Sequence, residues 1–146
     1  IFFFNSHITH VSGELHKSVW ERYNNGDEEI SNALDMIRQA GLDMASAISK
    51  ESTTAVISSI NQVMIAVDLL GKELHEPFRQ ILSELTKQNL VSTWKAMGAG
   101  GGGVVGLVIN NLSDREKIVT LLEAKGWSHI DWSIDFTGIY RTETIL

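Results

Sequence analysis

The residues with the clearest chemical potential are glycines gathered in the second half of the chain. Five of the six residues at 98–103 are glycine. Consecutive peptide N–H groups can converge on an anion such as phosphate, and a bare backbone lets a ligand approach closely. Each glycine held in one conformation costs roughly 0.5–1 kcal/mol relative to alanine, a cost that a purely structural turn does not require. The run therefore predicts a ligand-binding loop.

Two familiar phosphate-binding loops do not fit this run. A Walker-type loop ends in Gly-Lys-Ser or Gly-Lys-Thr and opens a helix, whereas Val104 and Val105 follow the loop here. The dinucleotide fingerprint is formally matched, with Glu123 at the position of a ribose-binding acid. That fingerprint also opens a helix, but the β-branched and leucine run at 104–109 is typical of a strand. We therefore expect a loop between two strands.

The loop and its flanks resemble a known kinase motif. Lys95, the glycine run and the hydrophobic stretch after it resemble the third conserved motif of the GHMP small-molecule kinases, which include galactokinase, homoserine, mevalonate and phosphomevalonate kinases. Upstream, residues 59–62, 69–74 and 78–82 resemble the helix, Leu-Gly turn and second helix of mevalonate kinase. One departure is Met97, because the family usually has Thr or Ser before the first glycine.

The resemblance, which covers about 52–122, implies a function. The chain would be the C-terminal half of a kinase that transfers a phosphoryl group from Mg-ATP to a small metabolite, with mevalonate as the best guess. ATP and Mg would be the cofactors, while the main phosphate loop and the catalytic residues would lie in an N-terminal half. This chain alone would then be inactive. The residues implied to bind the cofactor are Lys95, Gly98, Ala99, Gly100, Gly101, Gly102 and Gly103.

Two alternatives stay open on the residues alone. Lys95 is equally well explained as a solvated lysine at a strand end. The whole chain is alternatively a non-catalytic small-molecule-binding or dimerisation module of ferredoxin-like fold, in which the glycine loop holds an effector and no chemistry occurs. The sequence encoded before Ile1 distinguishes the two functions.

Composition limits the partners. The chain has 146 residues, a net charge of −6 and no cysteine, and its pI is about 5.3. This size suits a single domain over residues 1–146, and the lack of a basic stripe argues against nucleic acid and anionic membranes. No window approaches about 18 uninterrupted apolar residues, so we expect no transmembrane helix. We expect a cytoplasmic protein, because the absence of cysteine is compatible with a reducing compartment.

The N-terminus predicts a fragment. The chain begins with Ile1 rather than methionine, and its first four residues are typical of a buried strand. We expect it to be a piece of a longer protein, with an N-terminal kinase domain as its partner. The edge exposed where that domain would dock would allow a homodimer.

Two other residue pairs could do chemistry but are better explained otherwise. His7 and His10 are spaced to chelate a metal, yet no third ligand lies near them in sequence, so we expect surface histidines and no metal. Asp131 and Asp135 share one side of an alternating segment, where paired carboxylates could act as acid and base. The solvated face of a sheet normally carries such residues, so we expect no catalytic role.

Hydrophobic periodicity and end signals predict the elements that position the loop. We expect strands at about 1–4, 90–97, 104–109, 129–136 and 139–143, and helices at about 11–23, 28–49, 53–70, 78–88 and 114–125. The expected end signals are an Asp27 cap, a Ser52 or Thr53 cap, a stop at Gly71, Pro77 in a first turn, and a capping box of Ser113 and Glu116.

The two long helices carry regular apolar stripes. We expect both stripes to be core, and we assign Met44 and Met64 to packing rather than to a cofactor pocket. The resulting fold class is α+β, a mainly antiparallel sheet with helices packed on one face. It agrees with the ferredoxin-like C-terminal domain of GHMP kinases. The stripes comprise Ile30, Leu34, Ile37, Gly41, Met44 and Ile48 in the first helix, and Val56, Ile57, Ile60, Val63, Met64, Val67 and Leu70 in the second.

Overall fold

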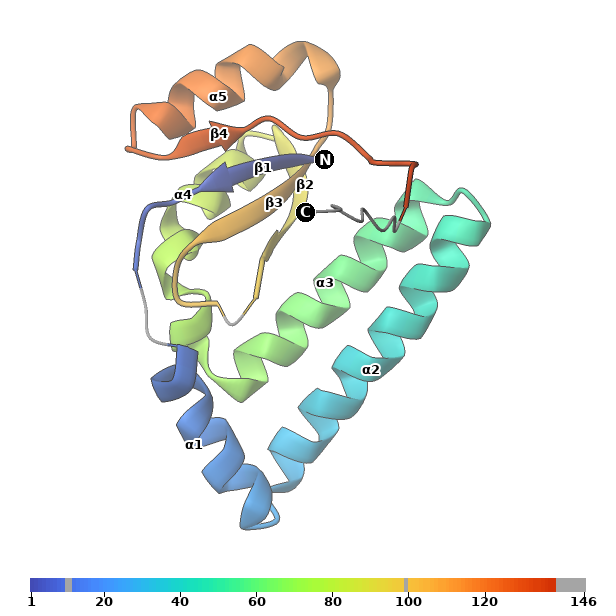
Figure 1. Ribbon diagram of the computed structural model, residues 1–146, viewed down its shortest axis with the longest axis vertical. Helices are drawn as coiled ribbons and strands as arrows, with labels where there is room; N and C mark the ends of the chain where they lie inside the picture. The colour runs from blue at the N-terminus through green and yellow to red at the C-terminus, as the bar shows by residue number, and fades with distance from the viewer. Residues whose placement is uncertain (10–11, 99, 139–146) are drawn as a thin grey trace, which may run out of the picture.

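The computed structural model (Figure 1) describes residues 1–9, 12–98 and 100–138 as an α+β fold. Long helices dominate the first half of the chain, and most strands lie in the second half. The elements in chain order are β1 (Phe2–Asn5), α1 (Ser12–Asn24), α2 (Glu28–Ser49), α3 (Thr53–Leu70), the short 3₁₀ helix η1 (Lys72–Leu74), α4 (Glu76–Lys87), β2 (Val91–Ala96), β3 (Val104–Ile109), the 3₁₀ helix η2 (Leu112–Asp114), α5 (Arg115–Glu123) and β4 (Ser128–Ile130).

The described strands form one antiparallel sheet in the order β2-β3-β1-β4. The N-terminal strand β1 is therefore central, with Phe4 paired to Val105 on one side and to His129 on the other. β2 and β3 form a hairpin that pairs Lys95 with Gly106. The glycine loop connects these two strands, as the sequence predicts.

The main core lies between one face of the sheet and helices α4 and α5. Phe78 of α4 and Leu122 of α5 are fully buried against Phe4 and its neighbours on the strands. At roughly 25 cal/mol per Å² of apolar surface, burial of each such side chain contributes on the order of 1.5–3 kcal/mol. The remaining buried members are Leu82, Leu85, Leu90, Val91, Ala96, Val105, Leu107, Ile118 and Trp127.

The prediction that helices pack on one face only is wrong, because α3 contacts the opposite face. Successive residues of a strand point to opposite sides of a sheet. Trp94 of β2 packs on Phe78 of α4, whereas its neighbour Thr93 donates a hydrogen bond from Oγ1 to Asn61 Oδ1 of α3 at 2.6 Å. Lys95 shares the α3 side with Thr93.

Helices α2 and α3 run side by side as an antiparallel pair (Figure 1). The buried positions of α2 are Ile30 and three alanines at seven-residue spacing, Ala33, Ala40 and Ala47. Small residues at this spacing keep one face narrow enough for close helix approach. The larger apolar side chains beside them are only partly covered.

Most predicted helix ends are confirmed. Asp27 accepts hydrogen bonds from the N–H groups of Glu29 and Ile30, and Ser52 accepts one from Ala55. Gly71 ends α3, and Pro77 lies in the first turn of α4. These signals act within a few residues, so the sequence alone reveals them.

The C-terminal part departs from the predictions. Ser113 lies inside η2, and α5 begins after Asp114 without a side-chain cap, so the expected capping box is wrong. The expected strand at 129–136 is also wrong beyond residue 130, because only Ser128–Ile130 pairs with β1. Leu121 of α5 is 36% exposed, whereas Ile118 and Leu122 of the same helix are buried. The strand expected at 139–143 lies outside the described residues.

Among the described helices, α3 has the length and composition to cross a membrane. The 18 residues of α3 have a mean hydropathy of 1.4, and 11% of that stretch is buried. Core helices of water-soluble proteins pass the same test of length and composition. Here the helix packs against α2 and β2.

Candidate ligand site

The glycine loop owes most of its composition to its own backbone. Gly98, Gly100, Gly101 and Gly103 all have positive φ angles of 74–82°, a region that residues with a Cβ atom rarely adopt. A Cβ atom on Gly100 would also lie 2.6 Å from the carbonyl oxygen of Leu74. The expectation that a structural turn would not need these glycines is therefore wrong, and their number alone does not indicate a ligand.

Contacts on two sides hold the loop in place. The N–H of Gly101 donates to the carbonyl of Leu74 at 2.7 Å, and the N–H of Gly103 donates to the carbonyl of Ile8 at 3.0 Å. The carbonyl of Gly103 accepts from both the N–H and the Oγ of Ser6, at 2.9 and 2.8 Å. The loop is thus fixed between η1 and the segment after β1, and two of its N–H groups are already used by the protein.

Lys95 lies just before this loop and is half-buried. Its Nζ donates to the carbonyl of Ala96 at 2.9 Å, and within the part of the chain that the structure describes it has no carboxylate partner. Burial lowers the pKa of Lys95 below its usual value. Half-burial of the Lys95 side chain differs from the fully solvated lysine at a strand end that was the alternative.

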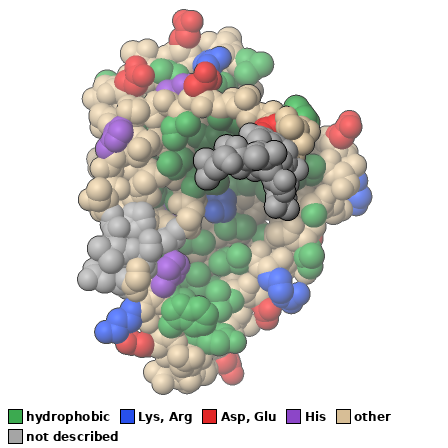
Figure 2. Space-filling model, viewed as in Figure 1, with side chains coloured by type: hydrophobic (Ala, Val, Ile, Leu, Met, Phe, Trp, Pro, Cys, Tyr) green, Lys and Arg blue, Asp and Glu red, His purple; other side chains and the backbone are tan. Residues whose placement is uncertain are grey.

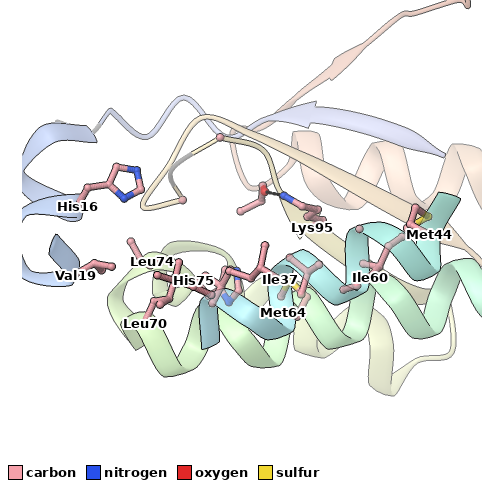
Figure 3. A pocket seen from close by; sticks show the side chains of 18 of the residues that line it. His16, Val19, Ile37, Met44, Ile60, Met64, Leu70, Leu74, His75 and Lys95 are labelled. Atoms are coloured by element: carbon pink, nitrogen blue, oxygen red, sulfur yellow. Dashed lines mark hydrogen bonds between the residues drawn. The ribbon is translucent and has the colours of Figure 1, made fainter. Parts of the chain in front are cut away.

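A cavity of about 570 Å³ opens beside Lys95, between the helices and the loop. Figure 2 shows hydrophobic side chains gathered on this face around a hollow. In the close view, Lys95 reaches over a floor that includes Ile37, Ile60 and Met64 (Figure 3). The lining comprises His16, Val19, Trp20 and Tyr23 of α1; Leu34, Ile37, Ala40, Gly41 and Met44 of α2; Ile60, Val63, Met64, Val67 and Leu70 of α3; and Leu74, His75, Lys95, Ala96, Gly98 and Gly100.

The cavity corrects the assignment of the two helical stripes. Met44 and Met64 were expected to be closed core, yet both line the cavity and are only partly buried. Ile48 of the same stripe is 64% exposed. The periodicity identifies the apolar face of each helix correctly, but it does not reveal whether another element fills the space above that face.

A buried histidine that the sequence analysis missed also lines the cavity. His75 is 2% exposed, and its Nδ1 lies 2.8 Å from Asp68 Oδ1. The same oxygen accepts a hydrogen bond of 2.6 Å from Arg79 Nη2, and the ring packs edge-on against Trp94. Burial has the largest effect on the pKa of His75 and lowers it, whereas the hydrogen bond to Asp68 acts in the opposite direction. No standard motif spacing marks this cluster, because a tight turn between α3 and α4 brings Asp68, His75 and Arg79 together, and Trp94 comes from β2.

The other candidate residues do not gather at the cavity. His7 Nε2 is hydrogen-bonded to Ser128 Oγ at 2.7 Å, while His10 lies outside the described residues. Asp135 Oδ1 accepts from the N–H of Thr137, which lowers the pKa of that carboxyl group. In the described ranges, no group of three His, Asp or Glu side chains could hold a metal ion.

Of the seven predicted cofactor-binding residues, Lys95, Gly98 and Gly100 line the cavity. Ala99 lies outside the described residues, and Gly101 and Gly103 face η1 and the segment after β1 through their hydrogen bonds. Gly102, between them, is buried and does not line the cavity. No family model, no curated protein and no solved structure matches this chain.

Proposed function

We propose that this chain is the C-terminal half of an ATP-dependent GHMP-type small-molecule kinase. The observation that carries the proposal is the glycine loop on a β-hairpin of a sheet ordered β2-β3-β1-β4. If α1–α3 are treated as an insertion, the remaining elements follow the β-α-β-β-α-β order of a ferredoxin-like domain, with α4 and α5 on one face. This arrangement supports the fold that the sequence resemblance implies.

In this proposal the chain supplies one wall of the phosphoryl-transfer site. Phosphoryl transfer is catalysed mostly by positioning and by stabilising charge. The loop at 98–103 would close the cleft against a phosphate loop from an N-terminal half, and Lys95 would contribute positive charge. The catalytic base and the Mg ligands would come from that other half, so this chain alone would have no kinase activity. Mevalonate is the first acceptor to test.

The proposal is tested on the full product of the natural gene. We expect a glycine- and serine-rich phosphate loop to be encoded before Ile1, and the full protein to phosphorylate mevalonate, galactose, homoserine or phosphomevalonate with Mg-ATP. A matched pair of variants tests the loop. Gly98 and Gly138 both have φ near +75° and open space where a Cβ would lie, so alanine imposes similar backbone strain at both.

We expect Gly98→Ala to lower kcat/KM at least tenfold and Gly138→Ala to leave it within twofold. Absence of any phosphate loop upstream, or no activity with these acceptors in the full protein, would refute the kinase proposal. Equal effects of the two variants would refute the role of the loop.

A second candidate function is favoured by the cavity itself. An effector-binding module needs its pocket within one chain, and the described residues enclose about 570 Å³ without any N-terminal half, within the usual range of roughly 300–1,000 Å³ for ligand pockets. A DNA-binding or unrelated catalytic domain upstream of Ile1 would favour this function over the kinase.

A further inference from the structure

The cavity has an apolar body and a polar end. Along α2 and α3 its walls are aliphatic and thioether side chains such as Ile37, Met44 and Met64 (Figure 3). At the end next to the glycine loop the walls include Lys95 and His75, which lie close enough for the Lys95 charge to act on the histidine. A ligand that matches both parts must itself be amphiphilic.

Among the residues that the structure describes, no carboxylate pairs with the Lys95 ammonium group at the polar end of the cavity. Asp68 is the carboxylate of the His75 cluster, but its Oδ1 already accepts from Arg79 and lies against His75. Among the described residues, Lys95 Nζ donates a hydrogen bond only to the neutral carbonyl of Ala96. A half-buried ammonium group without a counter-ion is costly in apolar surroundings, and an anion bound there would remove much of that cost.

We propose that this cavity binds a small amphiphilic anion, with a carboxylate or phosphate head on Lys95 Nζ and an apolar body along α2 and α3. The apolar body would gain roughly 25 cal/mol for each Å² removed from water, and the charge-assisted hydrogen bond to Lys95 would select anions over neutral analogues. This inference goes beyond the kinase proposal and deepens the second candidate function, because it names the ligand class for a cavity that lies within this chain and needs neither ATP nor a second domain.

The test measures binding of octanoate, octyl phosphate and octanol to the 146-residue chain by isothermal titration calorimetry without ATP. We expect at least one anion to bind ten or more times tighter than octanol. The preferred anion identifies the head group. Lys95→Met should bring the anions to within twofold of octanol and leave octanol binding unchanged. The matched control is Lys117→Met, at an exposed lysine on α5, which should behave like the wild type.

A second variant tests the location independently of the charge. Gly41 lies on α2 at the cavity wall, and a Cβ atom there would meet nothing within 4 Å. Gly41→Leu should therefore fold and fill the space, weakening all three ligands at least tenfold. The proposal is overturned if octanol binds the wild type as tightly as both anions, if Lys95→Met keeps the anion preference, or if Gly41→Leu leaves binding unchanged. Because ATP is absent, none of these results bears on the kinase proposal.

Discussion

Replacing Gly41 with alanine should stabilise the protein. Gly41 lies well inside the 22-residue helix α2, its φ is not in the left-handed region, and a Cβ atom would meet no neighbour within 4 Å. Alanine is favoured over glycine in a helix interior by about 0.8–1.0 kcal/mol. With no clash to oppose this gain, Gly41→Ala should raise the free energy of unfolding by about 1 kcal/mol. For a chain of this size, that corresponds to roughly 2–4 °C in Tm.

The assay is urea and thermal unfolding followed by circular dichroism, with Gly26→Ala as the matched control. Gly26 also has open space where a Cβ would lie, but its φ is +77°, where an L-residue costs roughly 1–2 kcal/mol. Replacing glycine with alanine should therefore raise the free energy of unfolding at position 41 and lower it at position 26. If Gly41→Ala lowers the unfolding free energy, or if both variants shift it in the same direction, the assignment of open space at this cavity wall is refuted.

Three further predictions concern stability. The folded-state pKa of His75 is lowered, so the unfolded chain binds a proton at His75 more readily than the folded chain does. The stability that neutral His75 supports is therefore complete above about pH 6.5 and is lost as the pH falls toward the folded-state pKa. The urea midpoint should fall between pH 7.5 and pH 5, and it should fall less steeply in His75→Gln. Gly100→Ala combines a positive φ with the 2.6 Å contact to the Leu74 carbonyl, so chemical denaturation should show a loss of about 1–3 kcal/mol, and an unchanged midpoint would contradict the loop geometry. Asp27→Ala removes both the cap of α2 and the 2.7 Å ion pair with Arg22 and should cost about 1–2 kcal/mol; Asp27→Asn, which keeps a capping oxygen, should recover most of it.

The elements that the sequence predicts correctly are those specified by nearby residues. Asp27, Ser52 and Gly71 mark helix ends through hydrogen bonds that span at most four residues. The strand after the glycine run is likewise defined by its β-branched composition and confirmed as β3. Local signals of this kind can be identified from the sequence because they do not depend on contacts with distant elements.

The candidate site was harder to predict because distant elements create it. The apolar stripes of α2 and α3 indicate which faces are buried, but the cavity exists because α1 and the glycine loop enclose part of the space above them. His75 becomes notable only once Asp68 and Trp94 lie against it. Conversely, the alternation at 131–136 is typical of a strand, yet within the described residues the pairing with β1 ends at Ile130.

The central position of β1 has a consequence for the order in which the chain can fold. Its partners β3 and β4 begin about 100 and 120 residues later in the sequence, so loop-closure entropy opposes their pairing until most of the chain is available. The α2–α3 hairpin needs only contacts between neighbouring elements and can form during synthesis. Sheet completion must wait for Ser128–Ile130 to leave the ribosome. Until β3 is synthesised, Phe2, Phe3 and Phe4 form an unpaired aromatic strand, and the edge of β1 that pairs with β4 stays open until Ser128–Ile130 is available.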